Sequence, residues 1–179
     1  MTLNLAKAIY DVAHLTGSFT LRSGQKSTEY FDKYLFESNP VVLSLITDEL
    51  VRFIPEGTEV LAGLEMGGIP IVTALSLKSG MPSAYVRKRA KAYGTCKLAE
   101  GADIQGKRVC VIEDVVTTGG QILLSVQDLR DAGAIVENVI CVIERNPEGR
   151  QKLGEVGLTL HSLFKMDDLL AAANIGVNG

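Results

Sequence analysis

The feature that most constrains this chain is a short apolar run that ends in two acids and a glycine-rich turn. Residues 109–112 are Val-Cys-Val-Ile, and Glu113 and Asp114 follow them directly. An apolar, mostly β-branched run of this length is typical of a strand buried on both faces of a parallel sheet. Residues 117–120 are Thr-Thr-Gly-Gly, and residues 121–130 have an amphipathic pattern that predicts a helix. This order predicts a ligand site at the carboxyl end of a strand.

The chemistry of this turn indicates a phosphorylated ribose as its ligand. Glycines let backbone N–H groups approach an anion closely, and a helix N-terminus adds unpaired donors and partial positive charge. Two adjacent carboxylates would repel a bare phosphate, so they need ribose hydroxyls or a magnesium ion shared with a polyphosphate. A tight turn and a solvated strand end would explain each feature separately, but not their order. No Lys follows the glycines, so this is not the GxxxxGK[ST] loop.

Composition narrows the class of protein. A length of 179 residues fits one domain, and a net charge of -3 argues against a nucleic-acid binder held by charge alone. No apolar run approaches the ~18 residues of a membrane span, so we expect no membrane partner. The three cysteines (Cys96, Cys110 and Cys141) have neither disulfide nor zinc spacing, which favours a reducing, cytoplasmic location.

Strands and helices are predicted to alternate along the chain. The pattern predicts helices over 3–15, 41–53, 69–77, 121–130 and 166–173, and strands over 60–63, 83–86, 109–112, 134–143 and 158–163. Asn39 before Pro40 marks a helix start. A polar turn at 23–27 is predicted to join two further short strands. This alternation predicts an α/β fold with a mostly parallel central sheet and helices on both faces. We expect a single domain over 1–179.

A cationic stretch follows the strand predicted at 83–86. It contains five Lys or Arg residues before Glu100 and lacks a clean apolar period. A solvated surface loop is the ordinary interpretation of such a charge run. The functional interpretation is a mobile lid, over about 87–105, that closes over a polyanion and excludes water. Arg offers bidentate contacts to phosphate, and Lys offers a movable point charge.

Three segments resemble motifs of the type I phosphoribosyltransferases, and of the orotate phosphoribosyltransferase family in particular. V-I-E-D-V-V-T-T-G-G resembles the phosphoribosyl-pyrophosphate motif, F-T-L-R-S-G-Q-K-S with Y-F-D resembles the hood segment, and V-R-K-x-x-K-x-Y-G-T resembles the catalytic loop. The resemblance implies the type I phosphoribosyltransferase fold with a small N-terminal hood over about 1–37. It also implies transfer of the 5-phosphoribosyl group to orotate, giving orotidine 5'-phosphate and pyrophosphate in pyrimidine biosynthesis.

The resemblance further implies roles for individual residues. Catalytic roles on the leaving pyrophosphate would fall on Arg87, Lys88 and Lys91. Phosphoribosyl pyrophosphate would contact these three cations and Glu113, Asp114, Val115, Val116, Thr117, Thr118, Gly119, Gly120 and Gln121. Orotate would contact Thr117, Arg145, Arg22, Tyr30 and Phe31. The family also implies a Mg²⁺ cofactor held mainly by substrate and water rather than by direct protein ligands. It implies a homodimer in which the lid reaches the neighbouring subunit's site.

The chain departs from the family pattern at three places. Arg22 stands where many members have Lys, and Tyr93 stands where some members have His. The loop that touches pyrophosphate often carries a Lys, whereas this chain has Met66 and Gly67 there. Two alternatives stay open: a phosphoribosyltransferase for another base, such as a purine, and a non-catalytic regulator that binds phosphoribosyl pyrophosphate. The hood segment and Arg145 favour an acidic pyrimidine, and the lid cations favour catalysis.

Overall fold

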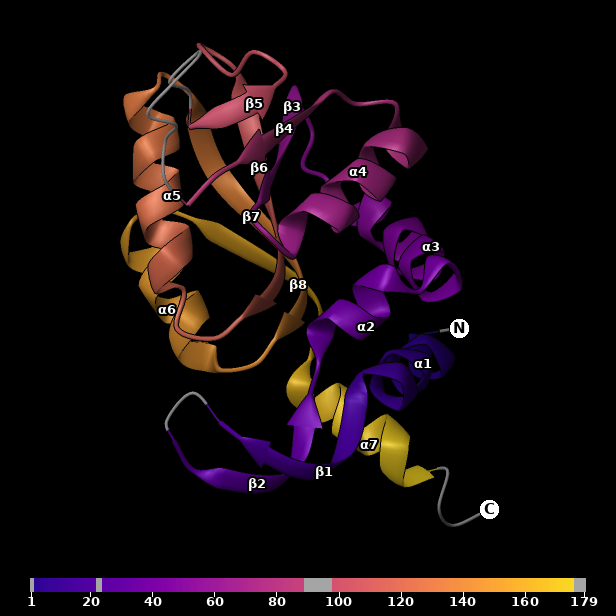
Figure 1. Cartoon of the computed structure of the whole chain (residues 1–179). Coiled ribbons are helices and arrows are strands. Elements are labelled where there is room, and N and C mark those ends of the chain that lie inside the picture. The colour runs from indigo at the N-terminus through magenta and orange to yellow at the C-terminus, as the bar shows by residue number, and fades with distance from the viewer. Residues whose placement is uncertain (1, 22–23, 89–97, 176–179) are drawn as a thin grey trace.

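The computed structural model describes residues 2–21, 24–88 and 98–175, and its architecture is an α/β sheet with a separate N-terminal hairpin (Figure 1). The helices are α1 (Thr2–Ala13), α2 (Lys33–Ser38), α3 (Pro40–Leu50), α4 (Gly68–Ser79), α5 (Gly120–Asp131), α6 (Pro147–Glu155) and α7 (Met166–Ile175), with a 3-10 turn, η1 (Val51–Phe53). The strands are β1 (His14–Thr20), β2 (Lys26–Phe31), β3 (Val60–Leu64), β4 (Ser83–Val86), β5 (Ala99–Gly101), β6 (Arg108–Val116), β7 (Ile135–Glu144) and β8 (Thr159–Lys165).

The central sheet has the strand order β5-β4-β3-β6-β7-β8. Strands β4, β3, β6, β7 and β8 run parallel, and the short β5 runs antiparallel to β4. Strand β6 therefore lies in the middle of the sheet, and the carboxyl ends of the parallel strands share one edge. The predicted fold class, a mostly parallel sheet with helices on both faces and a small N-terminal hood, is confirmed.

Side chains of β6 alternate between the two faces of the sheet, as the period of a strand requires. Cys110 and Ile112 pack in the core beneath α1, α3, α4 and α7. Val109 and Val111 pack in the core on the other face, beneath α5 and α6. Figure 1 shows α3 and α4 on one side of the sheet and α5 and α6 on the other. Within the described ranges, no helix is long and apolar enough to cross a membrane.

The N-terminal hairpin forms a second, two-stranded sheet that lies beyond the carboxyl edge of the central sheet (Figure 1). Its strands pair His14 with Phe31, and the rings of Phe19 and Tyr30 stack with their centroids 5.4 Å apart. The first helix ends at Ala13, before the predicted end at residue 15, because β1 begins at His14. Strand pairing with β2 therefore overrides the helical spacing of the sequence.

Four local predictions need correction. Helix α2, strand β5 and helix α6 are present but were not predicted, because each is short or lacks an apolar stripe. Strand β6 does not end at residue 112: it continues to Val116, which pairs with Glu144 of β7. The two acids thus lie inside the strand rather than after it. Glu113 pairs with Cys141 of β7, and the Asp114 N–H donates to Oε1 of Glu113 (3.0 Å), while the pleat of the strand sets the direction of the two side chains.

Candidate active site

The loop between β6 and α5 lines a cavity of about 440 Å³ at the carboxyl edge of the sheet, which we call the loop pocket. Its lining consists of residues 113–122 together with Lys33, Tyr34, Glu65, Met66 and Lys88. Gly119 has a φ of 73°, a left-handed conformation that glycine adopts without steric penalty. No side chain caps the start of α5 in the described structure, so its first N–H groups are free to bind an anion.

Helix α6 supports this loop from below. A Cβ on Gly149 would lie 2.6 Å from the carbonyl oxygen of Thr117, so only glycine lets the helix approach this closely. Leu153 of the same helix is fully buried in the core that α5 shares. The loop therefore rests on a packed helix, and its conformation is set before a ligand binds. The sequence analysis did not identify Gly149, because a single glycine in a polar segment does not indicate a contact with a distant loop.

The acidic pair lies on the floor of the loop pocket beside two side chains from α2. Asp114 is fully buried, and Glu113 is 9% exposed. Lys33 places its Nζ 2.5 Å from Oδ2 of Asp114. Glu37, one turn further along α2, is 5% exposed and brings a third carboxyl group to the same place. Gly67 leaves the room they need, since a Cβ there would lie 1.6 Å from Asp114 Oδ2 and 2.8 Å from Glu37 Oε1.

These groups carry different protonation states. Burial, and then its contact with Asp114, raises the pKa of Glu37 to about 9, so this carboxyl is neutral at pH 7. Burial likewise raises the pKa of Glu113 well above its usual value. Burial opposes the charge on Asp114, but hydrogen bonds from its neighbours and the Lys33 charge hold its pKa below the usual range. Burial also opposes the charge on Lys33, but Asp114 raises its pKa. The ion pair of this cluster is therefore the one between the Asp114 carboxylate and the Lys33 ammonium group.

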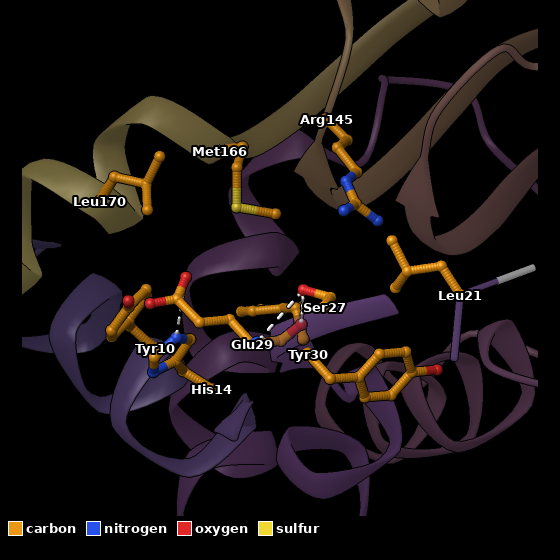
Figure 2. A pocket seen from close by; sticks show the side chains of 10 residues that line it. Tyr10, His14, Leu21, Ser27, Glu29, Tyr30, Arg145, Met166 and Leu170 are labelled. Atoms are coloured by element: carbon orange, nitrogen blue, oxygen red, sulfur yellow. Dashed lines mark hydrogen bonds and ion pairs between the residues drawn. The ribbon is translucent and has the colours of Figure 1, made fainter. Parts of the chain in front are cut away.

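A second cavity, of about 640 Å³, lies between the hairpin and the ends of β7 and β8 (Figure 2). We call it the hairpin pocket; its walls include Tyr10, His14, Glu29, Tyr30, Phe31 and Arg145. His14 stacks on Tyr10, with ring centroids 4.6 Å apart, and its Nε2 lies 3.7 Å from Glu29 Oε2. The Arg145 side chain points from the sheet toward the hairpin (Figure 2). Among its described walls, the pocket thus combines aromatic rings with the guanidinium group of Arg145.

Arg145 joins the two pockets. It follows the last residue of β7, and its backbone N–H donates to the carbonyl oxygen of Val116 at the end of β6 (2.8 Å). The preceding residue, Glu144, forms an ion pair with Arg150, whose Nη2 lies 2.6 Å from Glu144 Oε2. The guanidinium of Arg145 is exposed and has no ion pair within the described part of the chain. It is therefore free to bind an anionic ligand.

The predicted lid cations are only partly described. Lys88 lines the loop pocket. Arg87 points instead to β5: its N–H donates to the Leu98 carbonyl (2.9 Å), and its Nε lies 3.8 Å from Glu100 Oε1. The structure therefore does not bring Arg87 into the lining of the loop pocket. Outside the described residues lie positions 89–97 of the predicted lid and the predicted site residues Arg22 and Lys91, together with Tyr93.

The structure thus brings the predicted site residues together in two groups. Glu113 to Gln121 and Lys88 line the loop pocket, and Tyr30, Phe31 and Arg145 line the hairpin pocket. Thr117 lies in the loop pocket next to the Val116 carbonyl that holds Arg145. Sequence reasoning missed Lys33 and Glu37. Their signal was opposite charges four residues apart after Asp32, which caps α2 by accepting from the Tyr34 N–H.

The donor set of the loop pocket is suited to a hard cation that keeps its water. Carboxylate oxygens are the ligands Mg²⁺ prefers, and this ion retains several waters when it binds beside phosphates. Asp114 is already paired with Lys33, so a fully protein-built cation cage does not fit here. In the described ranges, no group of three His, Cys, Asp or Glu side chains is arranged to hold a metal ion. Binding through substrate and water fits the residues present.

The chain is similar to known proteins over nearly its whole length. Residues 38–156 match the family model described as "Phosphoribosyl transferase domain". An orotate phosphoribosyltransferase from a Nocardioides species is 52% identical over 98% of this chain and 99% of the relative. One from Methanocella arvoryzae is 50% identical over 86% of this chain and 88% of the relative. The Mycobacterium tuberculosis orotate phosphoribosyltransferase solved with 5-phospho-alpha-D-ribosyl 1-diphosphate is 27% identical, with a TM-score of 0.80 over 94% of this chain and 98% of that chain.

A parallel sheet whose central strand delivers two acids and a glycine-rich loop to a helix N-terminus defines the phosphoribosyltransferase class. Within this class, the chain belongs to the orotate phosphoribosyltransferase family.

Proposed function

We propose that this chain transfers the 5-phosphoribosyl group of phosphoribosyl pyrophosphate to orotate, giving orotidine 5'-phosphate and pyrophosphate. The observation that carries this proposal is the junction of the two pockets. The hydrogen bond from the Arg145 N–H to the Val116 carbonyl joins the residue after β7 to the end of β6, where the glycine-rich loop begins, and the Arg145 side chain lines the hairpin pocket. An anionic base in the hairpin pocket and a phosphorylated ribose in the loop pocket can therefore meet at this junction.

The loop pocket would hold the phosphorylated ribose. The 5'-phosphate would accept hydrogen bonds from backbone and hydroxyl groups of residues 115–121, at the free N–H groups of α5. Asp114, the ionised acid of the pair, would accept hydrogen bonds from ribose hydroxyls. Burial raises the pKa of Glu113, which favours a protonated carboxyl that can donate as well as accept beside it. The ribose would thus be fixed at both ends.

The reaction exchanges one bond at C1 of the ribose for another. The C1–O bond to pyrophosphate breaks, N1 of orotate forms the new bond to C1, and the proton of N1 is lost to solvent. No protein nucleophile is needed, so the site must position the two substrates and stabilise the charge of the leaving group. Lys88 already lines the loop pocket, and we assign the same role to Arg87 and Lys91.

The hairpin pocket would hold orotate. Arg145 would pair with the orotate carboxylate, since Arg offers two parallel N–H donors to a carboxylate. Tyr30 and Phe31 would lie beside the pyrimidine ring, and Thr117 would contact it from the loop. We assign Arg22 to the same subsite. An uncharged base would leave the Arg145 guanidinium unpaired, which gives the pocket a preference for an acidic pyrimidine.

We further propose Mg²⁺ as cofactor. When bound, it would neutralise charge on the leaving pyrophosphate. Glu113 and Asp114 would orient those hydroxyls and the water around the ion, without direct protein ligation of the metal. Titration of phosphoribosyl pyrophosphate with and without Mg²⁺ tests this: equal affinity in both conditions would remove the cofactor from the mechanism.

We also propose that the active unit is a homodimer in which each lid serves the neighbouring site. Complementation tests this arrangement. Lys91→Ala lacks a lid cation, and Arg145→Ala lacks the base contact, so each variant alone is expected to be nearly inactive. Random mixing of the two after reversible dissociation should restore roughly a quarter of wild-type turnover, because one site in each mixed dimer would be intact. Absence of any recovery would place each lid over its own site.

We place the reaction in the cytoplasm. The described cysteines support this location, since Cys110 and Cys141 are both free and buried in the core. Burial raises the pKa of the Cys110 thiol to about 12, so it stays protonated and unreactive.

The decisive experiment follows orotate absorbance after addition of phosphoribosyl pyrophosphate and Mg²⁺. We expect absorbance loss with orotate, and no pyrophosphate release when adenine, hypoxanthine or uracil is offered instead. Release with another base would keep the loop-pocket assignment and overturn that of Arg145. Tight binding of phosphoribosyl pyrophosphate without turnover of any base would identify a regulator instead of an enzyme.

A further inference from the structure

Lys33 is the side chain in the loop pocket that the proposed reaction has not used. It comes from α2, outside the central sheet, and its side chain is 35% exposed. Its Nζ contacts the buried Asp114 on the side where Gly67 has no side chain. The same ammonium group lines the pocket beside Met66 and Lys88. Lys33 therefore has a buried partner on one side and open space on the other.

The position of this ammonium group relates it to one part of the ligand. Along the carboxyl edge, the sheet order places β3 and then β4 beyond β6. The loop pocket extends the same way, from the start of α5 past Asp114 to Met66 after β3 and Lys88 after β4. A ligand with its 5'-phosphate at α5 and its ribose at Asp114 would direct its C1 substituent toward these last residues. Lys33, which contacts Asp114 and lines the same pocket, would then lie close to this substituent.

The charges of the side chains around Asp114 leave the Lys33 ammonium group available to a ligand. Burial raises the pKa of Glu37 to about 9 and also raises that of Glu113, whereas Asp114 is paired with the Lys33 ammonium group. One ammonium group has three donors, and Asp114 occupies one of them. The remaining donors of Lys33 face a cavity whose described lining contains one other cation, Lys88. A diphosphate group bound here would find two ammonium groups on the described elements.

We propose that Lys33 binds the diphosphate of phosphoribosyl pyrophosphate directly, bridging it to Asp114, and so holds the leaving group. This assignment rests on the proposed function and names a contact of the same site. Lys33 is fixed on the scaffold by its ion pair with a buried carboxylate, so it is available to the first ligand that binds. Because this contact involves only the diphosphate, Lys33 should bind free pyrophosphate as well as phosphoribosyl pyrophosphate.

Titrations with three probes test the assignment: inorganic pyrophosphate, phosphoribosyl pyrophosphate and ribose 5-phosphate, each with Mg²⁺. Lys33→Gln keeps an N–H donor for Asp114 but removes the charge. We expect it to weaken binding of the first two probes by about 10- to 100-fold, and to change ribose 5-phosphate binding by less than about twofold. An equal loss for all three probes would show that Lys33 acts only by holding Asp114, and would overturn the proposal.

Two further variants keep this test decisive. Lys107→Gln is the matched control, because Lys107 also pairs with a carboxylate, that of Glu59 (3.2 Å), but at the opposite end of β6. It should leave all three affinities unchanged. Met66→Lys added to Lys33→Gln returns a cation to the same pocket and should restore at least part of the pyrophosphate affinity. No recovery would count against a direct contact in this part of the pocket.

A second background allows the measurement even if Lys33→Gln alone folds poorly. Asp114→Asn removes the buried charge, and Lys33→Gln can then be added without leaving a carboxylate unpaired. Pyrophosphate affinity should still fall about tenfold between this single and this double variant. An unchanged affinity would exclude the contact. The outcome is separate from the base assignment, because none of these titrations contains orotate.

Discussion

The loop pocket and the hairpin pocket are built from different kinds of structure. The loop pocket belongs to the central sheet, and its essential carboxylate, Asp114, is fully buried. The hairpin pocket takes one wall from a two-stranded sheet, where Tyr30 is 42% exposed. A two-stranded sheet has little stability of its own, whereas β6 is supported on both sides and both faces. With the proposed assignments, we expect the ribose chemistry to lie on a rigid frame and recognition of the base to lie on an adaptable element.

Gly67→Ala is expected to disable the rigid region. The new Cβ would lie 1.6 Å from Asp114 Oδ2, so the buried carboxylate must move. Displacement of a positioning group by about 1 Å costs roughly 100-fold in rate, and we expect at least this loss of turnover. Binding of ribose 5-phosphate should weaken in parallel, as measured by calorimetry. Gly80→Ala is the control, since a Cβ there meets no atom within 4 Å, although its φ of 72° carries a small strain cost.

Arg145→Lys is expected to affect the junction of the two pockets. Lys keeps the charge but loses the bidentate geometry, so the KM for orotate should rise about 10- to 100-fold. The affinity for phosphoribosyl pyrophosphate should stay unchanged, because the backbone bond to Val116 does not depend on the side chain. Steady-state kinetics with each substrate varied in turn separates the two effects. A matching loss for both substrates would mean that the pockets are not independent.

Tyr30→Ala is expected to affect the adaptable region alone. The substitution removes an exposed ring that stacks on Phe19. The KM for orotate should rise about fivefold, in line with the roughly 0.5–1.5 kcal/mol of an aromatic contact. The free energy of unfolding should change by no more than ~0.5 kcal/mol, as for other surface substitutions. A large loss of stability in urea denaturation would contradict the distinction between the two regions.

Glu37→Gln is expected to change mainly how the free energy of unfolding depends on pH. The folded-state pKa of Glu37, about 9, is raised above the unfolded value near 4.5, so the folded protein retains a proton that the unfolded chain loses. This contribution to stability is fully present below about pH 4.5 and is lost as the pH rises toward 9. The variant is neutral in both states. Denaturation midpoints of the two proteins should therefore diverge between pH 5 and 9, with the wild type declining more; parallel curves would contradict a protonated Glu37.

The elements that the sequence predicts well are those that local pattern determines. The apolar runs of β3, β4, β6 and β7 lie in the sheet where their hydrophobicity requires it. Asn39 caps α3 by accepting from the N–H groups of Val41 and Val42 at 3.1 Å each. The glycine-rich loop and the start of α5 follow from short-range rules of backbone conformation. These signals lie within a few neighbouring residues, so one sequence suffices to detect them.

The elements that it misses depend on partners distant in sequence. Helix α6 has charged residues on most of its surface, and it is fixed by Leu153 and by the contact of Gly149 with Thr117. Strand β5 has three residues and exists because β4 offers an edge. The contact between Lys33 and Asp114 joins α2 to β6, and no local pattern of either segment indicates it. Tertiary packing, rather than intrinsic propensity, decides these cases.

The hydrogen bond between the Arg145 N–H and the Val116 carbonyl uses only backbone atoms. Any amino acid other than proline, which lacks the N–H, would therefore be presented at the same place relative to the glycine-rich loop. The backbone that would bind the sugar phosphate therefore does not depend on the side chain that would recognise the base. A lineage with this fold can change its base by exchanging one side chain after β7 and reshaping the hairpin, while the ribose chemistry stays intact.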